Sequence, residues 1–542
     1  MDTRIYIKDW LEIKPYKKQT ITDSFYLKVC NDVKRAITIN KKSFVLQMYL
    51  DKKDINLLSC FLTSYFEDII SETNIWNSFV KAHLRLYNKQ LPFYVLDEYY
   101  EKEINPQNIS FLIWYFINSV QDEKFISPFN NFIFETSEKI MDIFDKAWDH
   151  APENKYLKSF YQIDEDEEDF YVARNLIDTV LFKTYLFYPD TFLRLQKQEF
   201  EIIETSKDDE NLVMFLNENR DRNIHRVYTR LLSLIGKEWV SEILGKNHLL
   251  TKDFLTISKK IQGFFLYKGQ DNINIFIEHI ASGKKFNLTK KSFDHSHTLK
   301  ESDTILFMGI VQWKNEWWFS GVFFQQQFNP DLILDEKNSL ESRMSVNFLD
   351  HPRQATDEML NKQLLAFKDF NNGSQIAFLP SKKIEEFVEG YIEFFNNTLN
   401  LSEKEIKEAN QRARNEGFFD SKDKYKDFSE VSDTGLVFFN PKSGVEIALA
   451  VNSAFPMSSN PYFKEEDCEE HVMHLLMDKS VSTELVMYCI DNCKSRLSFF
   501  KNDIGKKYLE DIDFLLRFWK KDNYHTIPSI SYIGQNKETT GR

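Results

Sequence analysis

Residues 263–324 read GFFLYKGQDNINIFIEHIASGKKFNLTKKSFDHSHTLKESDTILFMGIVQWKNEWWFSGVFF. Short runs in this stretch alternate apolar with polar residues, and Gly, Asn and Asp separate the runs. Alternation with a period of two is typical of strands, and turn residues between two such runs indicate hairpins. The stretch therefore predicts a small five-stranded β-barrel over residues 260–328, with strands at 264–267, 273–280, 286–289, 304–313 and 317–324.

Residues 1–250 carry the apolar spacing of helices instead. Apolar side chains recur three or four residues apart around 57–70, 140–148 and 176–185. That spacing places them on one face of a helix. We predict a helical domain over residues 1–250, in which these faces pack together as an irregular bundle.

The chain after the barrel mixes both patterns. A strand-like run at 375–379 precedes helical spacing at 384–395, which predicts a strand and an amphipathic helix within residues 329–400. Ser402 and Glu405 then have the spacing of a capping box for a polar helix that runs to about residue 415.

Residues 401–542 contain this linker helix and a further α+β region. Pro441 and Gly444 indicate a hairpin turn between strands at 436–439 and 445–451, and Ser482 is expected to cap a later helix. The fold class that results is α+β, with a helical N-terminal half, a central small β-barrel and a smaller C-terminal α+β region.

Composition limits the classes of function. The chain has 542 residues, a net charge of −14 and 49 Phe, which we interpret as an ordinary multidomain protein with aromatic cores. An acidic balance makes nucleic acid an unlikely general partner, because phosphate binding needs an excess of Lys and Arg. The five Cys are odd in number and sparse, unlike a disulfide scaffold.

The longest apolar run, residues 109–117, is shorter than the ~18 residues that a membrane helix needs. The opening residues also lack the apolar segment of a signal peptide. We therefore expect a cytoplasmic protein with no membrane partner.

The sequence contains no glycine-rich phosphate loop, no dinucleotide-binding fingerprint and no nucleophile elbow, so we expect no cofactor. Two groups of residues are weak metal candidates. On a helix, His471 could share a metal with either Cys468 or His474, but not with both, and the alternative is a polar helix start. His295 and His297 lie in a loop that supplies no third ligand. We predict no metal site.

The barrel supplies the first binding candidates, Trp313, Trp317 and Trp318. Trp317 and Trp318 face opposite sides of one strand. The residues that share a strand face with Trp317 are more apolar than those that share a face with Trp318, so that face should point into the barrel. We therefore predict that Trp318 lies outside the barrel and docks on a helix of a flanking domain. The alternative is contact with a ligand. Polar candidates near these rings are Glu278, His279, Lys284 and Lys285.

A basic cluster supplies the other candidates. Arg222, Arg226 and Arg230 would align on a helix at i, i+4 and i+8 and could grip a phosphate or an acidic partner. They could equally pair with Glu218, Asp221 and the acidic run at 164–169.

Two resemblances follow from these residues. The opening Ile5-Tyr6-Ile7-Lys8-Asp9-Trp10-Leu11, followed by Lys14-Pro15-Tyr16, resembles the start of an uncharacterised bacterial protein family of unknown function. Residues 276–286, together with Trp318-Phe319-Ser320-Gly321, are similar to a barrel of bacterial proteins that often carry a SecA-tail-type zinc motif. The zinc motif, Cys-x-Cys followed by His-Cys, is absent here, and neither resemblance implies an activity.

These observations favour a soluble, non-enzymatic binding or scaffold protein whose macromolecular partner is another protein. The alternative is an unrecognised, metal-dependent hydrolase or nuclease with its site where the barrel meets the helical half. A third hypothesis is a nucleic-acid-associated factor that uses the arginine cluster. The oligomeric state stays open.

Overall fold

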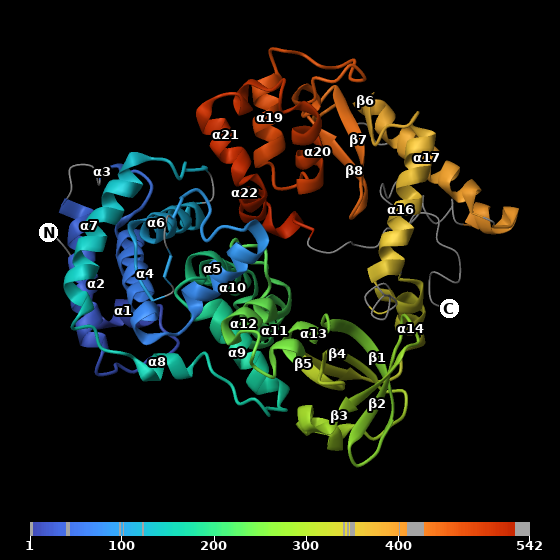
Figure 1. Cartoon of the computed structure of the whole chain (residues 1–542). Coiled ribbons are helices and arrows are strands. Elements are labelled where there is room, and N and C mark those ends of the chain that lie inside the picture. The colour runs from blue at the N-terminus through green and yellow to red at the C-terminus, as the bar shows by residue number, and fades with distance from the viewer. Residues whose placement is uncertain are drawn as a thin grey trace.

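A computed structural model describes most of the chain (Figure 1), namely residues 4–39, 44–96, 99–100, 102–121, 124–339, 342–343, 346, 353–399, 401–408 and 428–525. Helices fill the N-terminal half, five strands follow, and a second, three-stranded sheet with helices lies toward the C-terminus. The predicted α+β fold class is confirmed. No helix among the described residues combines the length and the apolar character needed to cross a membrane.

The N-terminal half is a bundle built around α6 (Pro106–Val120), whose residues 108–119 are all buried. This helix contains the longest apolar run of the sequence and is apolar on every side because other helices surround it. The other helices of this half are α1 (Ile7–Glu12), α2 (Asp23–Ile39), α3 (Phe44–Gln47), α4 (Lys52–Ser71), α5 (Ile75–Tyr87), α7 (Asn131–Trp148), α8 (Lys155–Ser159), α9 (Phe170–Phe182), α10 (Leu193–Ser206), α11 (Leu212–Arg226), α12 (Gly236–Leu244) and α13 (Thr251–Thr256).

Five strands follow, and they pair in the order β1-β2-β3-β5-β4 and close as a barrel. β3 and β5 pair in parallel, and the other pairs are antiparallel. Buried Phe265, Ile277 and Met308 contribute to the interior. The strands are β1 (Ile261–Gln270), β2 (Asn274–His279), β3 (Lys285–Thr289), β4 (Ile305–Trp313) and β5 (Glu316–Gln326).

One end of a predicted strand is wrong. The predicted strand at 273–280 includes Ile273, whereas β2 begins at Asn274 and Ile273 is 64% exposed. The Asp271 side chain accepts hydrogen bonds from the backbone N–H groups of Ile273 and Asn274, at 2.7 and 2.6 Å. This local turn holds Ile273 outside the strand, where it does not follow the alternation.

The indole rings of the barrel lie where strand parity predicts. Trp318 is 2% exposed and lies outside the barrel, with its ring centre 6.2 Å from that of Phe170 and 5.9 Å from that of Tyr171, both on α9. Trp317 packs toward the interior against Phe286. Trp313 is buried against Phe254 of α13. Two of the three rings therefore join the barrel to the helical half.

The acidic run also has a structural place. The Asp169 side chain accepts a hydrogen bond from the backbone N–H of Tyr171 at 2.7 Å and so caps α9. The backbone carbonyl of Glu168 accepts from Trp313 Nε1 at 3.1 Å. The run therefore begins a helix that supports the barrel.

The C-terminal region is a layered structure around the antiparallel sheet β6-β7-β8. Val437 and Phe439 of β7 face the core shared with α16 and α17, while Leu436 and Phe438 face the core shared with α19 and α20. Figure 1 shows these strands between the two groups of helices. The elements are α16 (Arg353–Phe370), β6 (Ile376–Pro380), α17 (Ile384–Thr398), β7 (Thr434–Asn440), β8 (Gly444–Leu449), α19 (Cys468–Met477), α20 (Thr483–Cys493), α21 (Asp503–Glu510) and α22 (Ile512–Trp519). The helix between the barrel and this region, α14 (Pro330–Asn338), packs against the barrel through Leu332 and Ile333.

Helix α22 connects this region to the N-terminal bundle. Phe514 and Phe518 belong to the large N-terminal core, whereas Leu516 belongs to the core beneath α19 and α20. A segment near the C-terminus therefore helps to complete the first half of the chain.

The predicted local signals are present where the structure describes them. Ser402 and Glu405 form the capping box, and Ser482 Oγ accepts from the backbone N–H of Leu485 at 3.1 Å. The predicted continuation of the polar helix from residue 409 to 415 lies outside the described residues.

We expect Trp318→Ala to lower the free energy of unfolding by about 3 kcal/mol or more, because it removes a buried ring from the contact between barrel and α9. Urea unfolding and limited proteolysis measure the change. Ile273→Ala, at an exposed position of the same barrel, is the control and is expected to change stability by less than about 0.5 kcal/mol. Parental stability of the Trp318 variant, with loss of a partner, would instead make Trp318 a binding residue.

Candidate functional site

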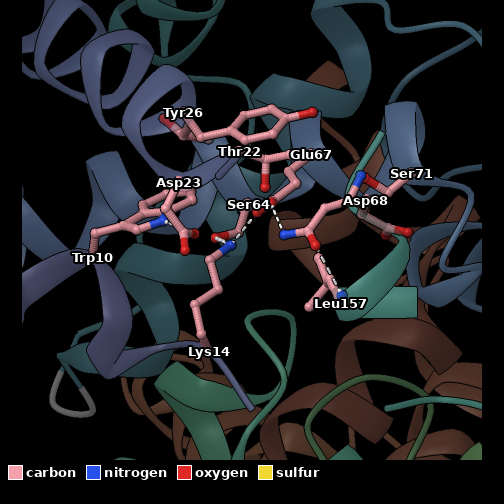
Figure 2. A network of polar contacts seen from close by, with 12 residues as sticks. Trp10, Lys14, Thr22, Asp23, Tyr26, Ser64, Glu67, Asp68, Ser71 and Leu157 are labelled. Carbon is pink, nitrogen blue, oxygen red and sulfur yellow. Dashed lines mark hydrogen bonds and ion pairs between the residues drawn. The ribbon is translucent and has the colours of Figure 1, made fainter. Parts of the chain in front are cut away.

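A buried ion pair lies at the centre of the N-terminal half (Figure 2). Lys14, just after α1, pairs through Nζ with the carboxylate of Glu67 on α4 and donates to Ser64 Oγ at 2.9 Å. The Lys14 and Glu67 side chains are 2% and 0% exposed. Nζ also lies 3.8 Å from the centre of the Trp10 ring. Two charges removed from water remain stable only when each has such partners.

A second buried carboxylate, Asp23, begins α2 beside this pair. Its Oδ1 accepts hydrogen bonds from Trp10 Nε1 at 2.8 Å and from the Tyr16 hydroxyl at 2.9 Å. Its Oδ2 accepts from Thr20 Oγ1 at 2.8 Å. The carboxylate therefore ties the segment around α1 to the first turn of α2.

Asn154 links the two parts of the network. Its Nδ2 donates to Glu67 Oε1 at 2.8 Å and to the Tyr16 hydroxyl at 3.0 Å, while its Oδ1 caps α8 by accepting from the Leu157 N–H. Burial, followed by the nearby Glu67 carboxylate, raises the pKa of Tyr16, so this phenol stays protonated. One connected network thus joins α1, α2, α4 and α8.

The network has almost no free space beside it. A cavity of about 10 Å³ lies next to Lys14 and Ser64, lined also by Asp68, Tyr161 and Tyr185. Such a volume is that of a single water at most. Asp68 is occupied as well, because it accepts from the Tyr185 hydroxyl and from the Trp76 N–H, each at 2.8 Å. The arrangement therefore stabilises the bundle and leaves no room for a substrate.

A second charged cluster lies between barrel and bundle. Lys260, the residue before β1, pairs with Asp221 at 2.7 Å and with Glu218 at 2.5 Å, both on α11. Arg174 of α9 pairs with Asp221 at 2.7 Å. These cations hold the pKa of Asp221 down to about 2 against the opposing effect of burial.

Ser320, His225 and Asp221 in this cluster have the residue types of a hydrolytic triad. The Ser320 hydroxyl donates to Asp221 at 2.8 Å, and His225 Nε2 lies 3.1 Å from the same hydroxyl. A nucleophile needs its proton acceptor aligned toward a substrate, whereas this serine is 1% exposed and bonded to the carboxylate itself. Burial lowers the pKa of His225 to about 4. The cluster joins the two parts of the chain.

The Trp-x-Ser-Gly pattern is explained by this interface. Trp318 packs on α9, and Ser320 bonds to α11. Gly321 has a φ of +92°, and a Cβ there would lie 2.4 Å from Glu218 Oε2 and 2.6 Å from Lys260 Nζ. Glycine is therefore required both by the backbone and by the approach of the ion pair.

The surface between α2 and α7 is open. A groove of about 900 Å³ lies there. Its apolar floor consists of Phe25, Val29, Ala36, Ile143 and Ala147, and Ile39 extends it at 70% exposure.

The rims of this groove are basic. They carry Lys28 and Arg35 from α2 and Lys139, Lys146 and His150 from α7, all exposed. Among the described residues that line the groove, Asp32 is the one acid, and it pairs with Arg35 at 3.1 Å. The residues that line the groove therefore carry a net positive charge, while α7 also carries Asp142 and Asp145, both exposed, between Lys139 and Lys146.

The sequence-predicted polar residues of the barrel do not converge on a site. Glu278 and Lys285 are cross-strand neighbours of β2 and β3. His279 is buried, its Nδ1 lies 2.9 Å from Ser282 Oγ, and burial lowers its pKa to about 4. Lys284 lies over the Phe286 ring at 5.9 Å.

The predicted alignment of three arginines is wrong. Arg222 and Arg226 are exposed on α11, but the helix ends at Arg226. Arg230 therefore leaves the line and is buried, with its backbone N–H bonded to Asp190 at 2.6 Å and its guanidinium 5.2 Å from the Phe518 ring centre.

The weak metal candidates have other contacts. His471 Nδ1 accepts from the backbone N–H of Ser453 at 2.9 Å, and His474 contacts the Asp478 carboxylate at 2.9 Å. Cys468 is buried, and His297 Nδ1 lies 3.2 Å from the backbone carbonyl of Asp294. The side chain of His295 is not among those that the structure describes. Within the described part of the chain, no group of three or more His, Cys, Asp and Glu is placed to hold a metal ion.

Sequence reasoning missed both the Lys14 network and the groove. Lys14 and Glu67 are far apart in sequence, and no local pattern pairs them. The groove left a signal: Lys28 and Arg35 are seven residues apart, as are Lys139 and Lys146. Such spacing places each pair on nearly the same side of its helix.

Comparison with known proteins identifies a family over the first half of the chain. Residues 4–272 match the family model described as "Protein of unknown function (DUF3843)", so the resemblance of the opening residues to an uncharacterised family is confirmed. The matched segment contains the bundle, the Lys14 network, the groove and β1. No curated protein and no solved structure matches the chain.

We expect Lys14→Met to lower the free energy of unfolding by about 3–5 kcal/mol, because it leaves the Glu67 carboxylate buried without its cation. Adding Glu67→Gln should recover part of this loss, since the unpaired charge disappears. Urea unfolding measures both variants, with the exposed Lys197→Met as control. Additive losses in the double variant would contradict a coupled pair.

A pH titration tests the barrel interface. His225 has a pKa near 4 when folded and an ordinary value of 6.5, so between these values the unfolded chain takes up a proton that the folded chain does not. Stability conferred by neutral His225 is therefore present above pH 6.5 and falls by about 2 kcal/mol as the pH drops to about 5. His225→Gln should lose less stability over this range, and an identical pH profile would contradict the assignment. His83 and His279, also with pKa values near 4, remain in both proteins.

Proposed function

We propose that the protein is a non-enzymatic binding protein of the cytoplasm and that it binds another protein in the groove between α2 and α7. The observation that carries the proposal is the combination of an apolar floor and exposed cations in one open groove. Apolar surface supplies binding free energy, and charged rims select and orient the partner.

The two buried clusters support a binding function because their side chains are not accessible to a substrate. The Lys14 network has a cavity of about 10 Å³, and Ser320 at the barrel interface is buried. The side chains of the Lys14 network and of the Ser320 cluster therefore hold the parts of the chain together. This weakens the alternative of a hydrolase or nuclease at the junction of barrel and bundle.

The nucleic-acid hypothesis also loses support. It needs a basic face on α11, and Arg230 is buried away from Arg222 and Arg226. The groove between α2 and α7 has cations, but among the described residues that form its floor Phe25 is the single aromatic ring, whereas bases that stack along a strand need a succession of rings.

Affinity recovery of partners from native cells tests the proposal. Wild type is compared with Lys28→Glu/Lys146→Glu, which reverses both rims of the groove. The control is Lys197→Glu/Lys252→Glu, which makes the same change of charge at exposed positions of α10 and α13. We expect one protein to be recovered with wild type and control and to fall at least about tenfold with the groove variant, equivalent to about 1.4 kcal/mol. Equal recovery with all three proteins, or turnover of a substrate by the purified chain, would sink the proposal.

A further inference from the structure

We infer that the groove binds an acidic amphipathic helix of the partner protein, an inference that rests on the proposed function. The first argument is a second apolar stripe on α2. Its inner stripe is Tyr26, Cys30, Val33 and Ile37, and all four are buried. The residues that line the groove recur at the same alternating spacing of four and three: Phe25, Val29, Asp32, Ala36 and Ile39.

Alternating spacings of four and three are those of a seam between packed helices. The inner stripe has its partners within the N-terminal core. The groove-lining stripe is only partly covered: Val29 is buried in the N-terminal core, Phe25 and Ala36 are half-buried, and Ile39 is exposed. This stripe is therefore a helix-packing surface that, among the described residues, only α7 borders and no third helix covers.

The second wall of the groove has matching geometry. The Tyr26 hydroxyl bonds to the backbone carbonyl of Pro152 at 2.7 Å, so the start of α2 lies beside the end of α7. The two helices run side by side (Figure 1). Ala36 on one wall and Ala147 on the other are small, which lets a third helix approach closely and place larger apolar side chains over them.

Charge selects the sequence of that helix. Because α2 and α7 are antiparallel, Lys28 lies toward the Lys146 end of the groove and Arg35 toward the Lys139 end. Seven residues along a helix span about 10.5 Å. A partner helix with carboxylates seven residues apart on both flanks of an apolar stripe would thus meet a cation from each wall at each end.

Asp32 distinguishes a helix from a phosphate chain. It lines the groove between Lys28 and Arg35, within the apolar stripe. A carboxylate there would repel a continuous phosphate backbone, whereas in a helical seam one polar residue sets the register of packing. Because Arg35 already pairs with Oδ1 of Asp32 at 3.1 Å, the partner helix should carry a single amide or basic residue that bonds to Oδ2.

Fluorescence anisotropy with synthetic peptides tests the inference. The probe is a labelled peptide of about four to five helical turns, with Leu at alternating spacings of four and three, Glu on both flanks and one Lys in the stripe. Two further peptides are a scramble of the same composition and a version with Lys in place of Glu. The full-length protein is titrated as wild type, Lys28→Glu/Lys146→Glu, Ile39→Asp and the control Lys197→Glu/Lys252→Glu.

The expected result is micromolar binding of the acidic helical peptide alone, weakened at least about tenfold in both groove variants and unchanged in the control. Binding should also weaken as salt rises from about 50 to 300 mM. Circular dichroism checks that the variants are folded, and because Ile39 and the lysines are exposed their melting curves should match wild type.

Four outcomes overturn the inference. Equal binding of the scramble shows charge attraction without a helix. Tighter binding of a single-stranded oligonucleotide that the groove variants abolish assigns the groove to nucleic acid. Self-association that is lost in the groove variants, seen by sedimentation, assigns it to a second copy. If a cellular protein still depends on the groove while the acidic peptide fails to bind, the proposed function stands and only the helical occupant is wrong.

Discussion

The ion pair between Lys14 and Glu67 is the constraint on which the N-terminal half depends. Neither charge has access to water, so the segment after α1 and the inner face of α4 must stay together. Asp23 and Asn154 extend this requirement to the starts of α2 and α8. Once the first turn of α2 is held in this way, one of its stripes faces the core, and the other is left at the groove beside α7.

The barrel is attached by the same kind of interaction. Lys260 reaches the two acids of α11, and Gly321 leaves the space that this ion pair occupies. Trp318 adds apolar contact with α9. These groups look reactive as a set of residue types, but their mutual contacts and burial make them structural. The groove differs from both buried clusters because its cations face solvent.

Much of the fold could be predicted from local patterns, because alternation and turn residues act over a few positions. The five strands, the side of the barrel that Trp318 faces and the Ser482 cap are confirmed. The predictions for Ile273 and Arg230 are wrong because a regular pattern does not continue to either residue. A turn at Asp271 keeps Ile273 out of the strand, and α11 ends before Arg230. The contacts of Lys14 with α4 could not be predicted, since tertiary packing joins it to residues 50 and 53 positions away.

The central claim is that the groove-lining stripe of α2 contacts a partner protein in the cell. Its most direct measurement is site-specific photo-crosslinking in the native host, with the photoreactive residue at Ile39 and, as a control of similar exposure, at Leu249. The account predicts a discrete crosslinked protein from position 39 that is missing from position 249 and disappears when Lys28 and Lys146 are reversed in charge. The same crosslinks from both positions, or none from position 39, would contradict it.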